Sequence, residues 1–448
     1  MRDRGAAHAA GIVAIPDAGS AVTQRCTGVV GSSRGIGDGG SNEMREEARR
    51  NMTGECVSVA RRMTAMLRSV CGMCGVCAVR LCLSLGALCL PFSVAAQSVP
   101  SDRHESVSLT FDRASVPQGW EFRRQIAAHY TPGRIEGSRT WFACRSTTDT
   151  TLGACSRTPS NASHPSSTDV ALRFTENRSQ LTVDLRIRAT KVVTVASSTC
   201  IHRRVALNST RSFGQCTGRF YDVSRYMLTI ERTELQKIPI GGIWRGRFEF
   251  DVREYQSQGP SAVHSYDIEL NVTDRQNAQI YFPTLSNTAP RVAFDLKTRP
   301  GPGFQPVVYG GRAVDVCFYD GFGSNSAGAL RVRAADVRGD IPGRPPGQAS
   351  LVLRNANGLL PSQRIDYRVG YTYAGAHRWL TVGGPAESFT PVAQSAIRIV
   401  RLPGMPVAVA CSPALLTFEV SPFLQSSKFA GGYEGRLRIE MFVDAALF

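Results

Sequence analysis

The chain has 448 residues, of which 42% are apolar, so it is long enough to bury the cores of two or three domains. Its formal net charge is +16, but the arginines are spread along the sequence singly or in pairs, and no lysine- and arginine-rich run occurs. This spacing argues against a nucleic-acid partner, because nucleic-acid-binding proteins concentrate basic residues in a patch or stripe. After residue 96, no histidine pairs with an acidic residue at metal-ligand spacing, and no nucleophile elbow or phosphate-binding loop occurs, so we expect no enzyme, no cofactor and no metal.

Residues 63–96 have the features of a signal peptide. Arginines precede an apolar run over 81–90, and small residues at 94–96 are typical of a cleavage site. The run is too short and wrongly flanked for a stable membrane span. We therefore predict export and a mature chain that begins near Gln97.

The first 62 residues are polar and rich in glycine, serine and arginine, without sustained periodicity. We interpret them as an unstructured, over-extended N-terminus, with translation starting at Met63 or Met66. We therefore expect no regular structure before the signal peptide.

The cysteines divide between the signal peptide and the mature chain. Seven of the 13 precede Gln97, including Cys71, Cys74 and Cys77, whose metal-like spacing falls inside the predicted signal peptide. The six that remain are Cys144, Cys155, Cys200, Cys216, Cys317 and Cys411. An even number in an exported chain indicates three disulfides.

Alternation of apolar and polar residues recurs along the mature chain, for example over 181–187, 266–272 and 437–443. Glycine, proline, asparagine and serine separate these runs. Helical periodicity is scarce, and the stretch 224–235 is compatible with either a short helix or a strand. The pattern predicts an all-β protein built from β-sandwiches.

A short polar link over 283–290 separates two groups of alternating runs. We place a domain boundary there, which gives a first domain over 97–289 and a second over 290–448. Two polar stretches, 156–169 and 338–348, are expected to form surface loops.

The stretch 315–326 is the most informative part of the chain. Val316 and Phe318 continue the inner face of a strand that also contains Cys317, and Asp320-Gly321 is a turn signal. This block resembles the pilin-domain signature of the CfaE/CblD-like fimbrial tip adhesins, the pilus initiators of the alternate chaperone–usher pathway. The resemblance covers nearly all of the chain after residue 138. The other blocks that carry it are 151–155, 172–179, 206–209, 234–244 and 271–274.

The resemblance implies two immunoglobulin-like β-sandwich domains in tandem, an adhesin domain followed by a pilin domain. It also implies disulfides 144–155, 200–216 and 317–411. In such a family the pilin domain lacks one strand, and a donor strand from the major pilin subunit fills the slot beside 436–444. A periplasmic pilus chaperone and an outer-membrane usher are the implied assembly partners, and the fimbrial tip at the cell surface is the implied location.

The resemblance also implies a host glycan or glycoprotein receptor, bound by basic residues of the first domain. Arg139 is at the position where the family motif has an arginine. Relatives have a cluster of basic residues near 253–255, of which only Arg253 is basic here, while residues 254 and 255 are not. Arg203 and Arg204 are weaker candidates. An arginine suits a sialyl carboxylate because its planar fork binds two oxygens. For each of the four, a solvated strand arginine is the alternative interpretation.

Two other functions stay open at this point. A structural tip cap that initiates the fibre without binding a receptor would keep the fold and lose the site. A secreted β-sandwich hydrolase would need paired carboxylates in a cleft, which a sequence alone does not reveal. The favoured prediction is a minor pilin at the fimbrial tip that initiates assembly and mediates adhesion.

Overall fold

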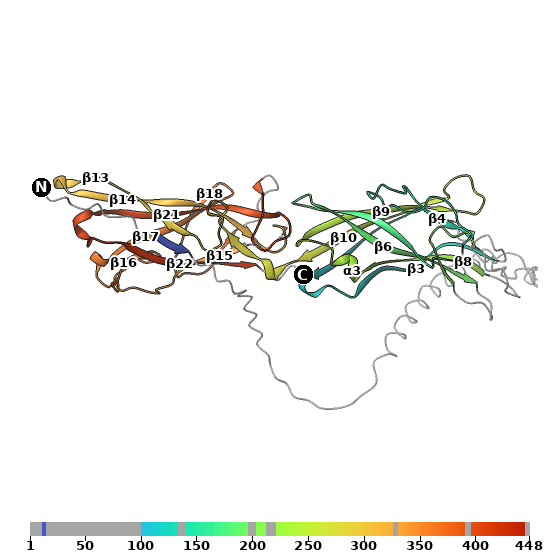
Figure 1. Cartoon of the computed structure of the whole chain (residues 1–448), viewed down its shortest axis with the longest axis horizontal. Coiled ribbons are helices and arrows are strands. Elements are labelled where there is room, and N and C mark those ends of the chain that lie inside the picture. The colour runs from blue at the N-terminus through green and yellow to red at the C-terminus, as the bar shows by residue number, and fades with distance from the viewer. Residues whose placement is uncertain are drawn as a thin grey trace, which may run out of the picture. The chain divides into compact units, whose positions relative to one another are not determined.

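The structure is a computed structural model of the whole chain (Figure 1). It describes residues 11–14 and 100–443, with gaps at 133–138, 163, 196–202, 212–220, 326–329 and 390–395. The predicted signal peptide, the start near Gln97 and the expected pair Cys200–Cys216 lie outside the described residues. Within them, no helix has the length and apolarity needed to span a membrane.

The first domain has one nine-stranded sheet system around a core to which several residues of the second domain also contribute. Its strand order is β2-β10-β9-β5-β6-β8-β3, with β4 on β9 and β7 on β6. All pairings are antiparallel except that of β2 with β10. The strands are β2 (Arg103–Asp112), β3 (Gly119–Pro132), β4 (Trp141–Cys144), β5 (Thr168–Glu176), β6 (Thr182–Val195), β7 (Arg203–Val205), β8 (Tyr221–Glu231), β9 (Gly242–Arg253) and β10 (Ala262–Thr273).

Period-2 alternation explains these strands, because side chains of a strand point alternately to opposite faces of a sheet. The predicted runs over 181–187 and 266–272 lie in β6 and β10. In β5, Val170, Leu172 and Phe174 are buried while their neighbours are more exposed. The ambiguous stretch 224–235 contains both structures, since β8 ends at Glu231 and a single helical turn, α3 (Arg232–Leu235), follows.

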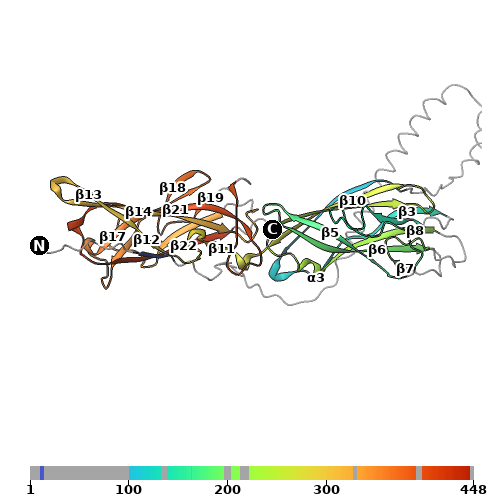
Figure 2. The ribbon, with the colours of Figure 1, turned by 45° about the horizontal axis from the view of Figure 1, so that its top comes forward.

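The second domain contains the remaining strands (Figures 1 and 2). Its main order is β11-β14-β21-β17-β16-β22-β1-β12, with shorter strands paired at the sides. The strands are β11 (Gln279–Tyr281), β12 (Arg291–Ala293), β13 (Asp295–Pro300), β14 (Pro306–Tyr319), β15 (Leu330–Asp336), β16 (Ala349–Leu353), β17 (Arg364–Tyr373), β18 (Ala376–Leu380), β19 (Glu387–Phe389), β20 (Arg398–Val400), β21 (Val409–Leu424) and β22 (Tyr433–Val443). Because β11 pairs with β14, the second domain takes in residues before the polar link 283–290.

Strand β1 (Gly11–Ala14) lies between β12 and β22. It pairs antiparallel with β12, where Ile12 faces Val292, and parallel with β22, where Ile12 faces Gly435. Regular structure at this place differs from the expectation that the first 62 residues have none. In the described part of the chain, no pairing joins β12 directly to β22, so their facing edges leave a slot that a strand can fill. Unpaired backbone groups at such edges favour the addition of a strand.

Two of the disulfides that the resemblance implies are present among the described residues. Cys144 is bonded to Cys155 with a Cα–Cα separation of 5.3 Å. Cys317 is bonded to Cys411 across 94 residues of sequence, with a Cα–Cα separation of 5.8 Å. The second bridge joins β14 to β21 at the ends of these strands that lie next to the first domain.

The two domains share a junction of closely packed backbone. The amide of Asp274 donates a hydrogen bond of 2.7 Å to the Gly321 carbonyl. A Cβ atom added to Gly241 would lie 2.1 Å from the same carbonyl oxygen, so only glycine fits there. The carboxylate of Glu176, which is fully buried, accepts a hydrogen bond of 2.9 Å from the Asn325 side chain. These residues belong to blocks that carry the family resemblance, so part of that resemblance reflects packing between domains.

Candidate functional site

Four side chains gather at the end of the first domain farthest from the junction. Strand β9 starts at Gly242, beside the junction, and ends at Arg253. Strand β4 pairs with that last part of β9 and places Trp141 directly opposite Arg253. We call the four residues Arg139, Trp141, Arg253 and Tyr255 the aromatic–arginine cluster. Sequence reasoning singled out the two arginines and missed the aromatic residues that accompany them.

Arg139 lies over an aromatic ring. Its guanidinium carbon is 4.3 Å from the centre of the Tyr255 ring, which is a cation–π geometry. Tyr255 is 36% exposed. The Nε atom of Arg139 is buried and has no hydrogen-bond partner among the described residues. A buried donor without a partner is costly, so the position of this arginine is not explained by its contacts within the described residues.

Arg253 has a carboxylate partner, although its Nε, like that of Arg139, is buried without a hydrogen-bond partner among the described residues. Its guanidinium carbon lies 5.6 Å from the centre of the Trp141 ring, and its Nη2 donates a hydrogen bond of 2.9 Å to Asp251. Asp251 is buried and also forms an ion pair of 2.7 Å with Arg145. Asp251 therefore partly compensates the charge of Arg253, whose side chain lies against the Trp141 ring within the cluster.

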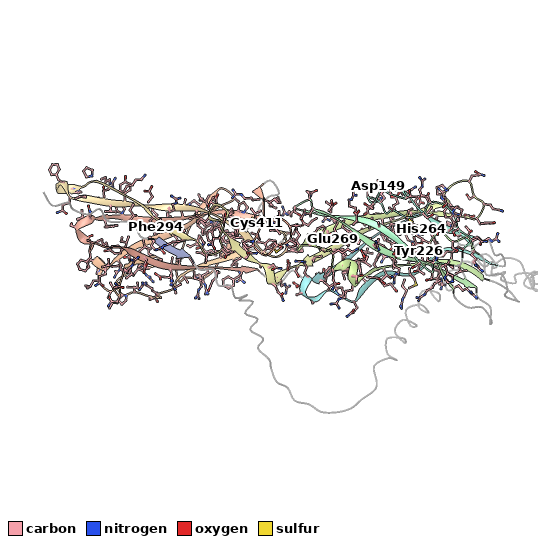
Figure 3. All side chains as sticks on the ribbon, in the orientation of Figure 1. Asp149, Tyr226, His264, Glu269, Phe294 and Cys411 are labelled. Atoms are coloured by element: carbon pink, nitrogen blue, oxygen red, sulfur yellow. A yellow bond between two sulfur atoms is a disulfide. The ribbon has the colours of Figure 1, made fainter. Side chains whose placement is uncertain are left out.

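Buried aromatic residues pack between the strands that carry the cluster, and Figure 3 labels Tyr226 and His264 among them. The rings of Phe142 on β4 and Phe250 on β9 meet edge to face at 5.7 Å, and the Tyr226 ring packs against both. The Tyr226 hydroxyl donates a hydrogen bond of 2.7 Å to Nδ1 of His264, whose Nε2 donates to the Ser101 carbonyl at 3.1 Å. Burial lowers the pKa of His264 to about 4, so this histidine is neutral near neutral pH.

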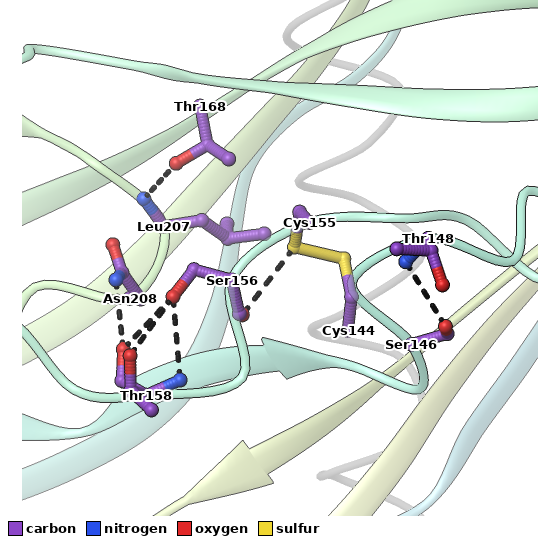
Figure 4. The surroundings of a disulfide bond; sticks show 9 residues. All are labelled: Cys144, Ser146, Thr148, Cys155, Ser156, Thr158, Thr168, Leu207 and Asn208. Carbon is purple, nitrogen blue, oxygen red and sulfur yellow. Dashed lines mark hydrogen bonds between the residues drawn. A yellow bond between two sulfur atoms is a disulfide. The ribbon is translucent and has the colours of Figure 1, made fainter.

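The Cys144–Cys155 disulfide fixes the end of β4 (Figure 4). Next to it, the Asn208 side chain donates a hydrogen bond of 2.8 Å to the Thr158 carbonyl. The amide of Leu207 donates at 2.9 Å to the Thr168 hydroxyl. The loop that follows β4 is thus bound to neighbouring segments, and the strand that carries Trp141 is held in a rigid frame.

Arg203 and Arg204 lie elsewhere on the same domain. Both are exposed on β7, where they face Val193 and Val192 of β6. The aromatic–arginine cluster is built on β4 and β9 instead. These two arginines therefore remain candidates on a separate strand.

A groove lies on the face formed by β2, β5, β9 and β10. Its volume is about 710 Å³, and Arg173, Arg245 and Arg247 line it together with Asp267 and Glu269. Sequence analysis did not find this groove. The sequence signal that could have indicated this groove is the presence of oppositely charged residues on strands predicted to be neighbours.

The arginines of the groove are already paired with carboxylates. Arg245 lies 3.0 Å from Glu269, and Arg173 lies 3.3 Å from Asp184. Because these pairs compensate one another, the groove has no marked preference for an anion. It also lacks an aromatic lining residue. The aromatic–arginine cluster therefore remains the better candidate for a receptor site.

Two protein-family models match the chain in succession. Residues 92–275 match the first domain of CfaE, a subunit of CFA/I fimbriae, and residues 278–445 match the second domain of the same protein. The chain belongs to this family. The CfaE protein of Escherichia coli is 28% identical over 355 residues, which cover 78% of this chain and 92% of that protein.

Solved structures of the family have the same fold. The crystal structure of CfaE, the adhesive subunit of CFA/I fimbria of enterotoxigenic E. coli, is 23% identical with a TM-score of 0.61, covering 77% of this chain and 99% of that one. A chaperone–tip adhesin complex from CFA/I fimbriae biogenesis contains a chain that is 25% identical with a TM-score of 0.57, covering 78% and 98%. The protein is thus a two-domain, non-enzymatic fimbrial tip adhesin subunit of the cell surface.

Proposed function

We propose that this subunit initiates assembly of a fimbrium and adheres to host-surface glycoconjugates through the aromatic–arginine cluster. The observation that carries the proposal is the position of Arg139. Its guanidinium lies over the Tyr255 ring, its buried Nε has no described partner, and the cluster lies at the end of the first domain away from the second. A ligand that reaches this end meets a cation and aromatic surface together.

The chemistry of the cluster suits an acidic sugar. A guanidinium binds a carboxylate through two parallel hydrogen bonds, and an exposed aromatic ring offers an apolar face to a sugar ring. Tyr255 occupies a position where the family's basic cluster lies, and here it supports Arg139 instead of adding a charge. We therefore propose that the receptor differs from that of relatives with a more basic cluster, while it keeps an anionic group.

The second half of the proposal concerns assembly. The slot between β12 and β22 accepts a strand, as the pairing of β1 with both of them illustrates. We propose that the N-terminal strand of the major pilin subunit fills this slot in the fimbrium. A periplasmic chaperone would cover the slot before assembly, and an outer-membrane usher would exchange the two. The chaperone–tip adhesin complex of the CFA/I relative supports the chaperone as a partner.

Adhesion is tested by replacing single arginines. The Arg139→Ala variant should lose at least about tenfold in binding to acidic glycans on an array, which corresponds to about 1.4 kcal/mol or more. Arg124→Ala serves as the matched control, because Arg124 is an exposed arginine of the same domain that pairs with Glu121 on β3, outside the candidate residues, and this variant should bind normally. Thermal unfolding of each variant shows whether folding is intact. Normal binding by Arg139→Ala would remove this residue from the site, and a wild-type protein that binds no glycan would favour the structural tip cap.

Strand addition is tested by fusion. A cognate pilin's N-terminal segment, attached after Phe448 through a short flexible linker, should raise the melting temperature, because the linker holds the strand near the slot at high effective concentration. Polar substitutions at alternate apolar positions of that segment should cancel the gain. If the unfused protein is already a stable monomer with the same melting temperature, the second sandwich is complete and the assembly proposal is wrong.

A further inference from the structure

The two ends of the second domain differ in their surroundings. Strand β14 runs from Pro306 to Tyr319, and Tyr319 is buried in the core of the first domain, so β14 ends at the junction. Each strand in the series β14, β21, β17, β16 and β22 is antiparallel to the one before it. Strands β14, β17 and β22 therefore run toward the junction, and β21 and β16 run away from it. Strand β22 therefore begins at Tyr433 at the end away from the first domain, and Val443 lies toward the junction. We call the end at Tyr433 the free end.

Apolar side chains are exposed at the free end. Of the 11 large hydrophobic residues exposed in the described part of the chain, five belong to it. These five form what we call the free-end patch: Phe304 (97% exposed), Leu359 (52%), Leu360 (54%), Leu424 (38%) and Phe429 (51%). Single exposed apolar residues are common on protein surfaces, whereas a gathering of several marks an interaction site.

The segments of the free-end patch are joined to one another. Leu424 is the residue opposite Val307 in the pairing of β21 with β14, and β14 follows the turn that carries Phe304. The amide of Phe429 donates a hydrogen bond of 2.9 Å to the Ser362 carbonyl, two residues after Leu360. The segments that carry the five residues are therefore joined to one another at the free end.

The patch is also held rigidly. The Tyr433 hydroxyl donates to the Phe429 carbonyl at 2.7 Å, and Nζ of Lys428 donates to the Pro361 carbonyl at 2.6 Å. Lys428 also lies over the Phe423 ring at 5.4 Å. A surface whose loops are fixed before binding loses little conformational entropy when a partner docks.

Phe304 has the most unusual position. Its φ is +60°, in the left-handed region that favours glycine, and it follows Gly303, whose φ is +67°. A phenylalanine in this conformation is strained, and its ring is almost entirely exposed. The turn thus holds a large apolar side chain in solvent, where a docking partner can cover it.

We propose that the free-end patch is the docking surface for the body of the fimbrial subunit whose N-terminal strand fills the slot between β12 and β22. This inference rests on the proposed function of that slot. The slot borders β22, which begins at Tyr433, and the Tyr433 hydroxyl is bonded to Phe429 of the patch. The junction end of the second domain packs against the first domain. A folded partner attached to the inserted strand therefore lies at the free end, where it meets the patch.

The test separates the strand from the body of the partner. The full mature chain is mixed with two probes, a synthetic peptide of the cognate pilin's N-terminal strand and the whole pilin subunit, and dissociation rates are measured. The double variant Phe304→Ser/Phe429→Ser should bind the peptide normally and release the whole subunit at least about tenfold faster than the wild type. Ile399→Ser is the matched control, because Ile399 is 49% exposed on β20, which pairs with β21 around Cys411 at the junction end.

Each other outcome has a defined meaning. Normal retention of the whole subunit by the double variant would overturn the inference and leave the slot proposal intact. Failure of the wild type to bind either probe would overturn the slot proposal itself. If the double variant loses its complex with the periplasmic chaperone but holds the pilin subunit normally, the patch belongs to the chaperone and the inference is wrong. Thermal unfolding of the peptide-bound variant checks that the second domain is folded.

Discussion

His264 should make the stability of the first domain depend on pH. It is 2% exposed and lies between the Tyr226 hydroxyl and the Ser101 carbonyl, so burial lowers its pKa from 6.5 to about 4. The folded state thus resists the protonation that the unfolded state accepts. The stabilisation is complete above about pH 6.5, is lost progressively as the pH falls toward 4, and changes little below that.

The magnitude follows from the same two pKa values. Each pH unit between 6.5 and about 4 removes about 1.4 kcal/mol, so the total loss is about 3 kcal/mol. His264→Gln is the informative variant, because glutamine can donate to Ser101 and accept from Tyr226 without titrating. The difference in unfolding free energy between wild type and variant should fall by about 3 kcal/mol between pH 7 and pH 4.

Urea denaturation at several pH values, with the donor strand fused as described above, measures this difference. Comparison with the variant removes the acid sensitivity that other residues contribute to both proteins. A difference that stays constant from pH 7 to pH 4 would refute the reasoning, because His264 would then titrate equally in the folded and unfolded states. Tyr226→Phe should reduce the pH dependence in part, since it removes the donor to Nδ1.

Two further predictions concern the framework of the molecule. Gly241→Ala should destabilise the protein by about 1–3 kcal/mol or more, because the new Cβ would meet the Gly321 carbonyl at the junction, whereas Gly259→Ala, with nothing within 4 Å of a new Cβ, should leave the melting temperature unchanged. Equal melting temperatures for the two variants would contradict this account of the junction. Replacing Cys317 and Cys411 together by alanine should cost up to about 4–5 kcal/mol in the chain-entropy model, since the bridge closes a separation of 94 residues. Urea denaturation measures this loss, and an unchanged midpoint would show that the loop is constrained by packing alone.

The strands could be predicted from sequence wherever one face is buried and the other meets water. The run over 266–272 is such a case, and it forms the second half of β10. The stretch 224–235 could not be assigned, because a strand and a helical turn meet inside it at Glu231. A local sequence pattern does not show where a strand gives way to a helical turn, because the tertiary packing of the strand determines the residue at which the strand ends.

The aromatic–arginine cluster was predictable only in part. Arg139 and Arg253 were found through the family resemblance, whereas Trp141 and Tyr255 were not. Trp141 comes to Arg253 through the pairing of β4 with β9, which are separated by about 100 residues, and no local pattern records that register. Tyr255 counted as a departure from the family pattern until its ring was placed beneath Arg139.

The core of the first domain does not stop at the domain boundary. Tyr319, Met405 and the Cys317–Cys411 pair of the second domain are buried in it. Removing either domain would therefore uncover apolar surface on the one that stays, and the two should unfold as a single cooperative unit. Experiments on an isolated domain would then measure an exposed junction as well as the intended property, so adhesion and strand addition are better studied in the undivided mature chain.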